Sequence, residues 1–264
     1  AVIGASYLQL PLILKARSMG VRTIAFAWAD GAVCKDYADE FLPISIVDKE
    51  AILAVCRERR IDGVTTIATD VAVPTVAYVA HHLGLIGNSE SSAYVSTNKF
   101  AMRKALSAAG VNCPRFALVH DADEALARAA ELRFPLIVKP CDRSGSMGVC
   151  KLTDISQVTS AVCDSLQQSL CKEAILEEFI ADACEISVEG ISWRGEHYVL
   201  AVTDKITTGA PHYVELGHHQ PSGLPPEIIA EAIRQVKSGV KALGIEYGAS
   251  HPELMITPDH RVYV

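Results

Sequence analysis

The first 90 residues alternate short apolar segments with helical ones, and this alternation is the strongest constraint on the fold. Apolar runs of strand length stand at residues 2–3, 22–27, 41–44 and 63–67. Between them, apolar residues at three- and four-residue spacing predict helices over 8–19, 48–60 and 71–83. Strands joined by helices of this length form right-handed βαβ units, so the sequence predicts a parallel sheet.

From about residue 97 the pattern changes to a mixed order of helices and strands. Helices are predicted over 99–109, 122–132, 155–170 and 226–243, and strands over 115–119, 135–140 and 174–179. Two longer strands, 184–193 and 197–202, are separated by Arg194-Gly195, which predicts a tight antiparallel turn. The second part of the chain is therefore expected to be a separate α+β structure.

Composition and charge exclude several classes of protein. The 264 residues carry 24 Lys and Arg against 31 Asp and Glu, a net charge of −7, so a broad nucleic-acid-binding surface is not expected. No apolar run approaches the ~20 residues that a membrane span needs. The eight cysteines include no Cys-x-x-Cys pair, which favours reduced thiols in a cytoplasmic protein. The chain opens and closes inside apolar strands, and we expect more chain to follow residue 264.

The turn after the first strand carries a weak nucleotide signal. A dinucleotide-binding turn needs Gly-x-Gly-x-x-Gly and an acidic residue about 20 positions later. Here the segment from Gly4 to Gln9 has one glycine, although Asp30 stands roughly where the acidic residue would. A nicotinamide-dependent oxidoreductase is therefore one alternative, and a helix N-terminus without a dinucleotide is the other.

A stronger signal is a lysine followed by a loop rich in glycine and serine. Lys139 ends a buried apolar strand, and the loop at 142–148 (Asp-Arg-Ser-Gly-Ser-Met-Gly) follows it. Backbone N–H groups and hydroxyls of such a loop can surround phosphate oxygens, and the lysine supplies a fixed positive charge. The segment is not a Walker loop, because Gly-x-x-x-x-Gly-Lys-[Ser/Thr] is absent. A surface hairpin with an extended lysine is the alternative interpretation.

Two further groups of acidic residues stand at predicted strands. Glu177-Glu178-Phe179-Ile180 ends an apolar strand, where main-chain groups and apolar walls could bind a purine, or where the charges could simply face solvent. Glu253 interrupts another apolar strand and is expected to face a cation or a base, because an unpaired buried carboxylate is costly. His251 stands beside it. His81 and His82 stand at a predicted helix end, where histidine suits the helix dipole, and a structural role is expected for them.

Together these segments resemble the ATP-grasp carboxylate–amine ligases. The resemblance runs through Thr97-Asn98-Lys99, Val138-Lys139-Pro140 with the loop after it, Glu177–Ile180 and the strand of Glu253. Within the family the chain is similar to carbamoyl-phosphate-synthase-like proteins and amino-acid ligases, and residues 213–221 are similar to a segment of the latter. The implied fold is α/β and α+β: a Rossmann-like pre-ATP-grasp domain over 1–90, linker helices over 91–112, and an ATP-grasp fold. That fold comprises a small lobe with a phosphate lid over 113–183 and a large lobe over 184–264, truncated at the C-terminus.

The resemblance also implies roles for particular residues. The ATP-binding set would be Lys99, Lys139, Ser144, Gly145, Ser146, Met147, Gly148, Glu177, Glu178, Phe179, Ile180 and Glu185. The two lysines of this set would contact the phosphates, and residues 144–148 would form a mobile lid. The main chain of Glu178 and Ile180 would bind the adenine edge, and Glu185 would hold the ribose. Glu253 would bind Mg²⁺ or Mn²⁺. Lys205 and His218 would be catalytic groups on the substrate side, although His218 and its neighbour could equally belong to a polar loop.

The implied reaction uses ATP to activate a carboxylate as an acyl phosphate, which an amine then attacks to form an amide-type bond. Phosphoryl transfer depends mainly on positioning and charge neutralisation, so lysines and the metal matter more than a nucleophilic side chain. The implied partners are a small-molecule carboxylate and amine, with neither nucleic acid nor membrane, and a homodimer is the default oligomer. A non-catalytic nucleotide-binding protein of the same fold and a nicotinamide-dependent oxidoreductase stay as alternatives.

Overall fold

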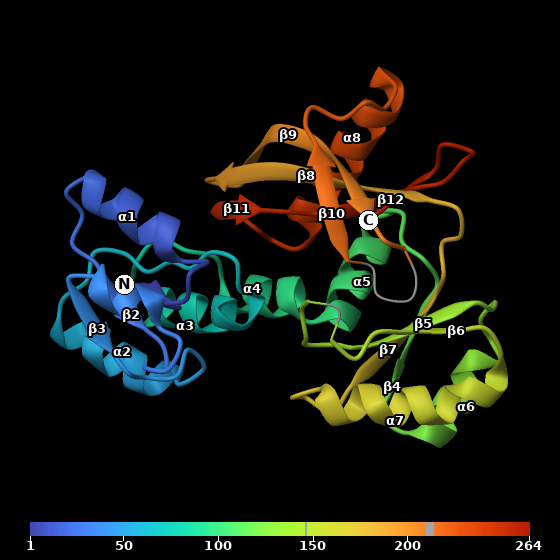
Figure 1. Ribbon diagram of the computed structural model, residues 1–264, viewed down its shortest axis with the longest axis horizontal. Helices are drawn as coiled ribbons and strands as arrows, with labels where there is room; N and C mark the ends of the chain where they lie inside the picture. The colour runs from blue at the N-terminus through green and yellow to red at the C-terminus, as the bar shows by residue number, and fades with distance from the viewer. Residues whose placement is uncertain (146, 210–213) are drawn as a thin grey trace. The chain divides into compact units, whose positions relative to one another are not determined.

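The computed structural model describes residues 1–145, 147–209 and 214–264 (Figure 1). The chain divides into two compact units, Ala1–Thr97 and Asn98–Val264. The first unit contains the βαβ segments, and the second contains two antiparallel sheets.

The first unit is built on a parallel sheet, as the sequence predicts. Its strands lie in the order β1 (Val2–Ile3), β2 (Ile24–Phe26) and β3 (Glu40–Leu42), with helices α1 (Leu10–Ser18), α2 (Lys49–Glu58), α3 (Val73–Leu83) and α4 (Glu90–Thr97). The predicted fourth strand over 63–67 is wrong: only Thr65 forms an isolated bridge, to Val2. The Thr66 hydroxyl donates a hydrogen bond to the Ile3 carbonyl, so a side chain contacts the backbone where a strand ladder would continue.

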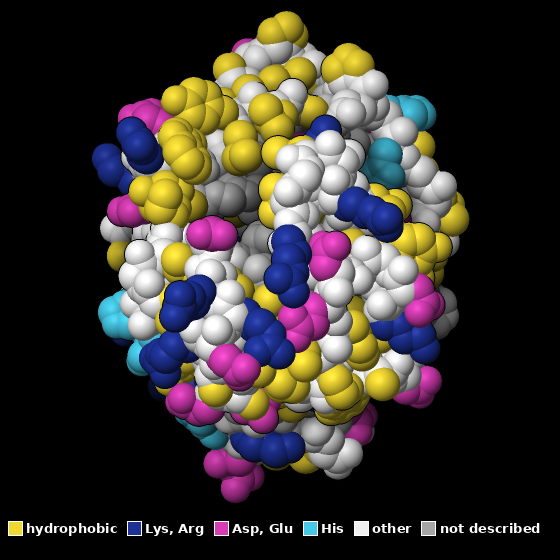
Figure 2. All heavy atoms as spheres, turned by 90° about the vertical axis from the view of Figure 1, so that its left-hand side faces the viewer, with side chains coloured by type: hydrophobic (Ala, Val, Ile, Leu, Met, Phe, Trp, Pro, Cys, Tyr) yellow, Lys and Arg dark blue, Asp and Glu magenta, His cyan; other side chains and the backbone are white. Residues whose placement is uncertain are grey.

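One face of the molecule carries charges of both signs. On the face that Figure 2 shows, Lys and Arg side chains lie among Asp and Glu side chains and do not form one basic patch.

All eight cysteines are free thiols, in agreement with the prediction. Within the described part of the chain, every helix is too short or too polar to span a bilayer.

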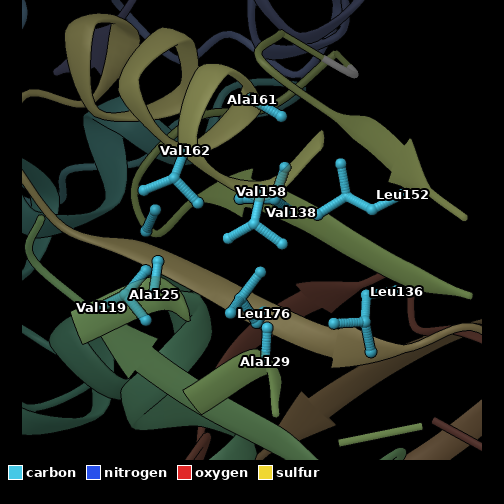
Figure 3. Close-up of a cluster of buried hydrophobic side chains, with 11 residues drawn as sticks. Val119, Ala125, Ala129, Leu136, Val138, Leu152, Val158, Ala161, Val162 and Leu176 are labelled. Atoms are coloured by element: carbon cyan, nitrogen blue, oxygen red, sulfur yellow. The ribbon is translucent and has the colours of Figure 1, made fainter. Parts of the chain in front are cut away.

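The smaller sheet of the second unit carries two helices on one face. Its strands lie in the order β4 (Phe116–Val119), β7 (Ala174–Glu178), β5 (Leu136–Pro140) and β6 (Cys150–Leu152), all antiparallel. Helices α6 (Ala122–Ala129) and α7 (Val158–Gln168) pack against it through a core of small and branched side chains (Figure 3). Alternate residues of β5 point into this core, which leaves Lys139 on the opposite face.

In the larger sheet, too, alternate side chains of a strand point to opposite faces. Its strands lie in the order β10 (Glu215–His219), β9 (Glu196–Thr207), β8 (Cys184–Trp193), β12 (Glu253–Ile256) and β13 (Val262–Tyr263), and β11 (Gly248–Ser250) also pairs with β8. The long helix α8 (Pro226–Ala242) covers one face and packs on Ile186, Val202 and Leu254. Side chains one position away in each strand point to the other face. That face carries Glu185, Lys205 and Glu253.

Helix α5 (Lys99–Ala108) contacts both sheets of the second unit. Its side chain Phe100 meets the Phe116 ring of β4 edge to face, at 5.8 Å between ring centroids. Arg103 of the same helix reaches Glu177 of β7 and the carbonyl of Val264, which follows β13. The helix therefore ties the end of the smaller sheet to the end of the larger one.

Candidate functional site

One buried ionic cluster lies at the ends of β5 and β7. The Glu177 carboxylate is 2.6 Å from the Lys139 ammonium and 2.5 Å from the Arg103 guanidinium. The side chain of Glu177 is only 6% exposed, and that of Lys139 is 19% exposed. Burial alone would raise the pKa of Glu177, but the charges of Arg103 and Lys139 lower it to about 2. The carboxylate is therefore ionised and fixes the direction of the lysine.

The loop after Lys139 has an anchored base. The Lys99 ammonium donates a hydrogen bond to the carbonyl of Arg143, and the Arg143 guanidinium donates to the Gln168 carbonyl at 2.6 Å. The carboxylate of Asp142 accepts from the Cys171 N–H at 2.7 Å. Lys99 and Lys139, 40 positions apart in the sequence, thus lie at the same loop.

Further along the loop, three described residues are exposed, and a glycine packs closely against the end of β5. Ser144, Gly145 and Met147 are exposed, while Ser146 lies outside the described residues. Gly148 has a φ of +69°, and a Cβ atom added there would stand 2.8 Å from the Cγ atom of Pro140. Only glycine therefore fits this close approach of the loop to the end of β5.

The segment after β7 is half-buried and partly engaged. The Glu178 carboxylate accepts hydrogen bonds from Arg115 at 3.2 Å and from the Arg133 N–H at 3.1 Å. The Phe179 N–H donates to the Pro135 carbonyl at 2.9 Å, and the Lys151 ammonium stands 3.7 Å from the centre of the Phe179 ring. A ligand bound here would therefore have to use the next main-chain donor, at Ile180.

A second cluster surrounds Lys205 on the face of the larger sheet away from α8. Three carboxylates from three strands lie around its ammonium: Glu185 at 2.9 Å, Glu215 at 2.6 Å and Glu253 at 2.5 Å. The Lys205 side chain is 2% exposed. Burial alone would lower the pKa of Lys205, but the hydrogen bonds to the three glutamates raise it above its ordinary value. The hydrogen bond from Lys205 in turn lowers the pKa of Glu215.

Histidines and another glutamate border this cluster. His218 Nε2 lies 3.5 Å from the Glu215 carboxylate. His251 Nδ1 is 3.2 Å from Glu189, and its Nε2 is 3.8 Å from Glu253. Glu253 thus pairs with the Lys205 ammonium, and its side chain is 55% exposed and not buried as expected.

Sequence reasoning missed three residues of these clusters. Arg103 stands one helical turn after Lys99, a spacing that could have indicated a shared face. Glu215 lies inside the segment that resembles amino-acid ligases, and Glu189 alternates with Glu185 along β8. The predicted strand 197–202 is too short: β9 continues to Thr207, and this extension carries Lys205.

The carboxylates around Lys205 are of the ligand type that a divalent cation prefers, and the Lys205 ammonium lies between them. Mg²⁺ and Mn²⁺ prefer carboxylate oxygens, and three such groups lie within 2.9 Å of a single ammonium. With three negative charges and one positive charge, the group keeps two formal negative charges. These residues therefore fit a divalent cation by their chemistry and charge.

The turn after β1 does not support a dinucleotide. The Gln9 side chain, 2% exposed, fills the turn: its carbonyl oxygen accepts from the Ser6 N–H at 3.0 Å. Its amide donates to the Ile67 carbonyl at 2.7 Å. An N–H group that would face a pyrophosphate is thus already bonded, and Asp30 is exposed in a turn.

Comparison with known families agrees with the geometry of the second unit. A family model described as an ATP-grasp domain matches residues 132–264, half of the chain. The chain belongs to the ATP-grasp family. The family resemblance found in the motifs is thereby confirmed, and the oxidoreductase alternative is not supported.

Individual ATP-grasp proteins are similar over most of this chain. An alanine–anticapsin ligase of Bacillus subtilis (strain 168) is 28% identical over 228 residues, covering 78% of this chain and 48% of the relative. The crystal structure of L-amino acid ligase from Bacillus licheniformis is 27% identical with a TM-score of 0.82, covering 100% of this chain and 64% of that one.

A third similarity concerns the fold alone. The biotin carboxylase domain of 2-oxoglutarate carboxylase from Hydrogenobacter thermophilus, solved with MgADP, ADP and bicarbonate, has a TM-score of 0.84 at 18% identity. The alignment covers 99% of this chain and 61% of that one. The chain spans about half the length of curated relatives such as the alanine–anticapsin ligase.

Proposed function

We propose that this chain binds Mg-ATP for a ligase that activates a small-molecule carboxylate as an acyl phosphate for attack by an amine. In the first step a carboxylate oxygen bonds to the γ-phosphorus of ATP, and the bond to the ADP oxygen breaks. In the second step the amine nitrogen bonds to the acyl carbon, inorganic phosphate leaves and the amine loses a proton. The product is an amide.

The smaller sheet supplies the proposed ATP contacts. Lys139 would bind the phosphates, held in direction by Glu177 at 2.6 Å. Lys99 shares the loop through its hydrogen bond to Arg143, and the exposed residues Ser144, Gly145 and Met147 of this loop would approach the same phosphates. The adenine edge would meet the carbonyl of Glu178 and the N–H of Ile180, because the Phe179 N–H is already bonded.

The larger sheet supplies the proposed metal and substrate groups. Glu253 would bind Mg²⁺ or Mn²⁺, and the proximity of Glu215 supports its participation. When bound, the metal would neutralise charge on the phosphates during transfer. Lys205 would then move toward the transferring phosphoryl group, and Glu185 would become available to the ribose hydroxyls. His218, beside Glu215, would face the substrate side.

The single observation that carries this proposal is the buried Lys139–Glu177–Arg103 cluster at the base of the glycine and serine loop. Burying three charged groups is costly unless they are paired. Here the arrangement fixes one lysine beside a loop rich in glycine and serine, which supports a role in phosphate binding.

The test separates nucleotide binding from catalysis. Mg-ATP should raise the melting temperature of this chain, and NAD should not. At a ligand concentration 100 times Kd, binding adds about 2.7 kcal/mol to the free energy of unfolding. The complete protein should then release ADP only when a suitable amino acid is added. Binding without carboxylate-dependent ADP release would instead support the non-catalytic nucleotide-binding alternative, and no binding would refute both.

A further inference from the structure

Three side chains of types that bind metals meet in the first unit. His81 and His82 occupy the last turn of α3, and Glu90 stands in the first turn of α4. One ring nitrogen of each histidine and one carboxylate oxygen lie within 4.8 Å of one another. All three side chains are exposed, so an ion can reach them from solvent.

The connection between the two helices brings these residues together. Helix α3 ends at Leu83, and the next residue, Gly84, has a φ of +65° that reverses the chain. The Leu85 N–H donates to the Ala80 carbonyl. Gly87 then passes so close to α3 that an added Cβ atom would stand 2.9 Å from the Cβ of Ala80. This tight return brings Glu90 back to the end of α3.

The local contacts prepare His82 as a ligand. Its Nδ1 lies 3.0 Å from the carbonyl of Tyr78, and a carbonyl can only accept, so Nδ1 carries the proton. The free lone pair is therefore on Nε2, the form in which histidine binds metals. The ring also stacks on Tyr78, at 4.1 Å between centroids, which limits its rotation.

The neighbouring histidine and the helix end add to this preparation. The His81 ring lies edge-on to that of His82, at 5.2 Å between centroids. Both stand at the C-terminal end of α3, where the helix dipole makes the potential negative and favours a cation. Two imidazoles and a carboxylate are a ligand set typical of Zn²⁺ with water in the remaining position.

We propose that His81, His82 and Glu90 bind one divalent transition-metal ion of the Zn²⁺ class. The ion would link α3 to α4 and stabilise the first unit. This replaces the purely structural role expected for the two histidines from sequence. The proposal is independent of the ligase function, because none of these residues belongs to the nucleotide or carboxylate clusters.

The experiment titrates metal-free protein with Zn²⁺ in a calorimeter, without nucleotide. The thiols are first alkylated, because Cys150, Cys163, Cys171 and Cys184 are exposed and would compete for zinc. We expect one equivalent of Zn²⁺ to bind, and Glu90→Gln or His81→Asn to weaken binding by at least about tenfold. The matched control is His120→Gln, which alters another exposed histidine beside carboxylates and should leave the affinity unchanged.

A second measurement makes the result independent of heat signals. Co²⁺ bound in place of Zn²⁺ should give a visible spectrum whose intensity reports low coordination, and Glu90→Gln should lose it. Circular dichroism melting checks that each variant is folded. The proposal is overturned if the alkylated wild type binds no Zn²⁺, or if both variants bind it as tightly as the wild type.

Discussion

Replacing Lys205 by methionine should destabilise the protein in a way that reveals the charge around it. The variant keeps the length of the side chain but removes the one cation among three carboxylates. Because each of these lies within 2.9 Å of the same nitrogen, the carboxylate oxygens that contact it are no more than about 5.5 Å apart. Two such charges repel by about 0.8 kcal/mol in water and about 3 kcal/mol at an effective dielectric constant of 20.

Three carboxylates make three such pairs, which repel by about 2 kcal/mol in total at the value for water. The side chains of Glu215 and Glu253 are 49% and 55% exposed, so solvent screens much of the repulsion. We expect a loss of about 2–4 kcal/mol in the free energy of unfolding at neutral pH. The repulsion disappears when a carboxylate is protonated, so the loss should shrink as the pH falls toward about 5. Excess Mg²⁺ should also restore stability to the variant more than to the wild type.

Thermal unfolding at both pH values, with and without Mg²⁺, measures these effects. The control is Lys237→Met, which removes an exposed lysine from α8 and should behave like the wild type under all four conditions. If Lys205→Met is as stable as the wild type at neutral pH, the three carboxylates do not interact as described. An equal loss at both pH values would mean that lost packing, and not repulsion, causes the effect.

Three other variants test the first cluster and its loop. Lys139→Met should weaken Mg-ATP binding about tenfold to hundredfold in a calorimetric titration, and unchanged affinity would remove its phosphate role. The pKa of Glu177 in the folded protein is below its ordinary value of 4.5. Its ionised form therefore adds about 3 kcal/mol to the free energy of unfolding above that pH. This contribution is lost as the pH falls toward about 2. The stability of Glu177→Gln should therefore lack this acid-dependent loss. The same acid profile in the variant and the wild type would contradict the ion pairing assigned to Glu177. Gly148→Ala should destabilise the protein by about 1–3 kcal/mol in chemical denaturation, because of its positive φ and the contact with Pro140. Its control, Gly145→Ala, has a similar φ of +66° but open space around it, so a smaller loss is expected, and equal losses would exclude the contact as a cause.

Much of the secondary structure follows from local sequence patterns. The strand 184–193 and the turn at Arg194-Gly195 agree with the structure, because alternating apolar residues and a glycine with positive φ specify a hairpin locally. Helix α8 also agrees closely, since its apolar stripe is strong and Pro225 and Pro226 mark its start. The prediction of a strand over 63–67 was wrong. Whether this segment continues the sheet, or bonds to it through the Thr66 hydroxyl, depends on the neighbouring strand and not on the local pattern.

The residue types of the site could also be predicted, but their partners could not. Lys139, Glu177 and Glu253 were identified from the position of charged residues on apolar strands, a cue that is local in sequence. Arg103 comes from a helix 74 residues before Glu177, and no local pattern relates the two.

The sequence by itself determined the order of strands and helices, the family, and the presence of lysines and glutamates suited to phosphate and metal. Only the tertiary structure decided which charge meets which. Strand pairing places Glu185, Glu215 and Glu253 around Lys205. Alternation puts one face of β8, β9 and β12 into the core under α8, which leaves Glu185, Lys205 and Glu253 on the other face. Local spacing specifies which residues share a face, whereas the charge balance of a site depends on contacts between segments far apart in the chain.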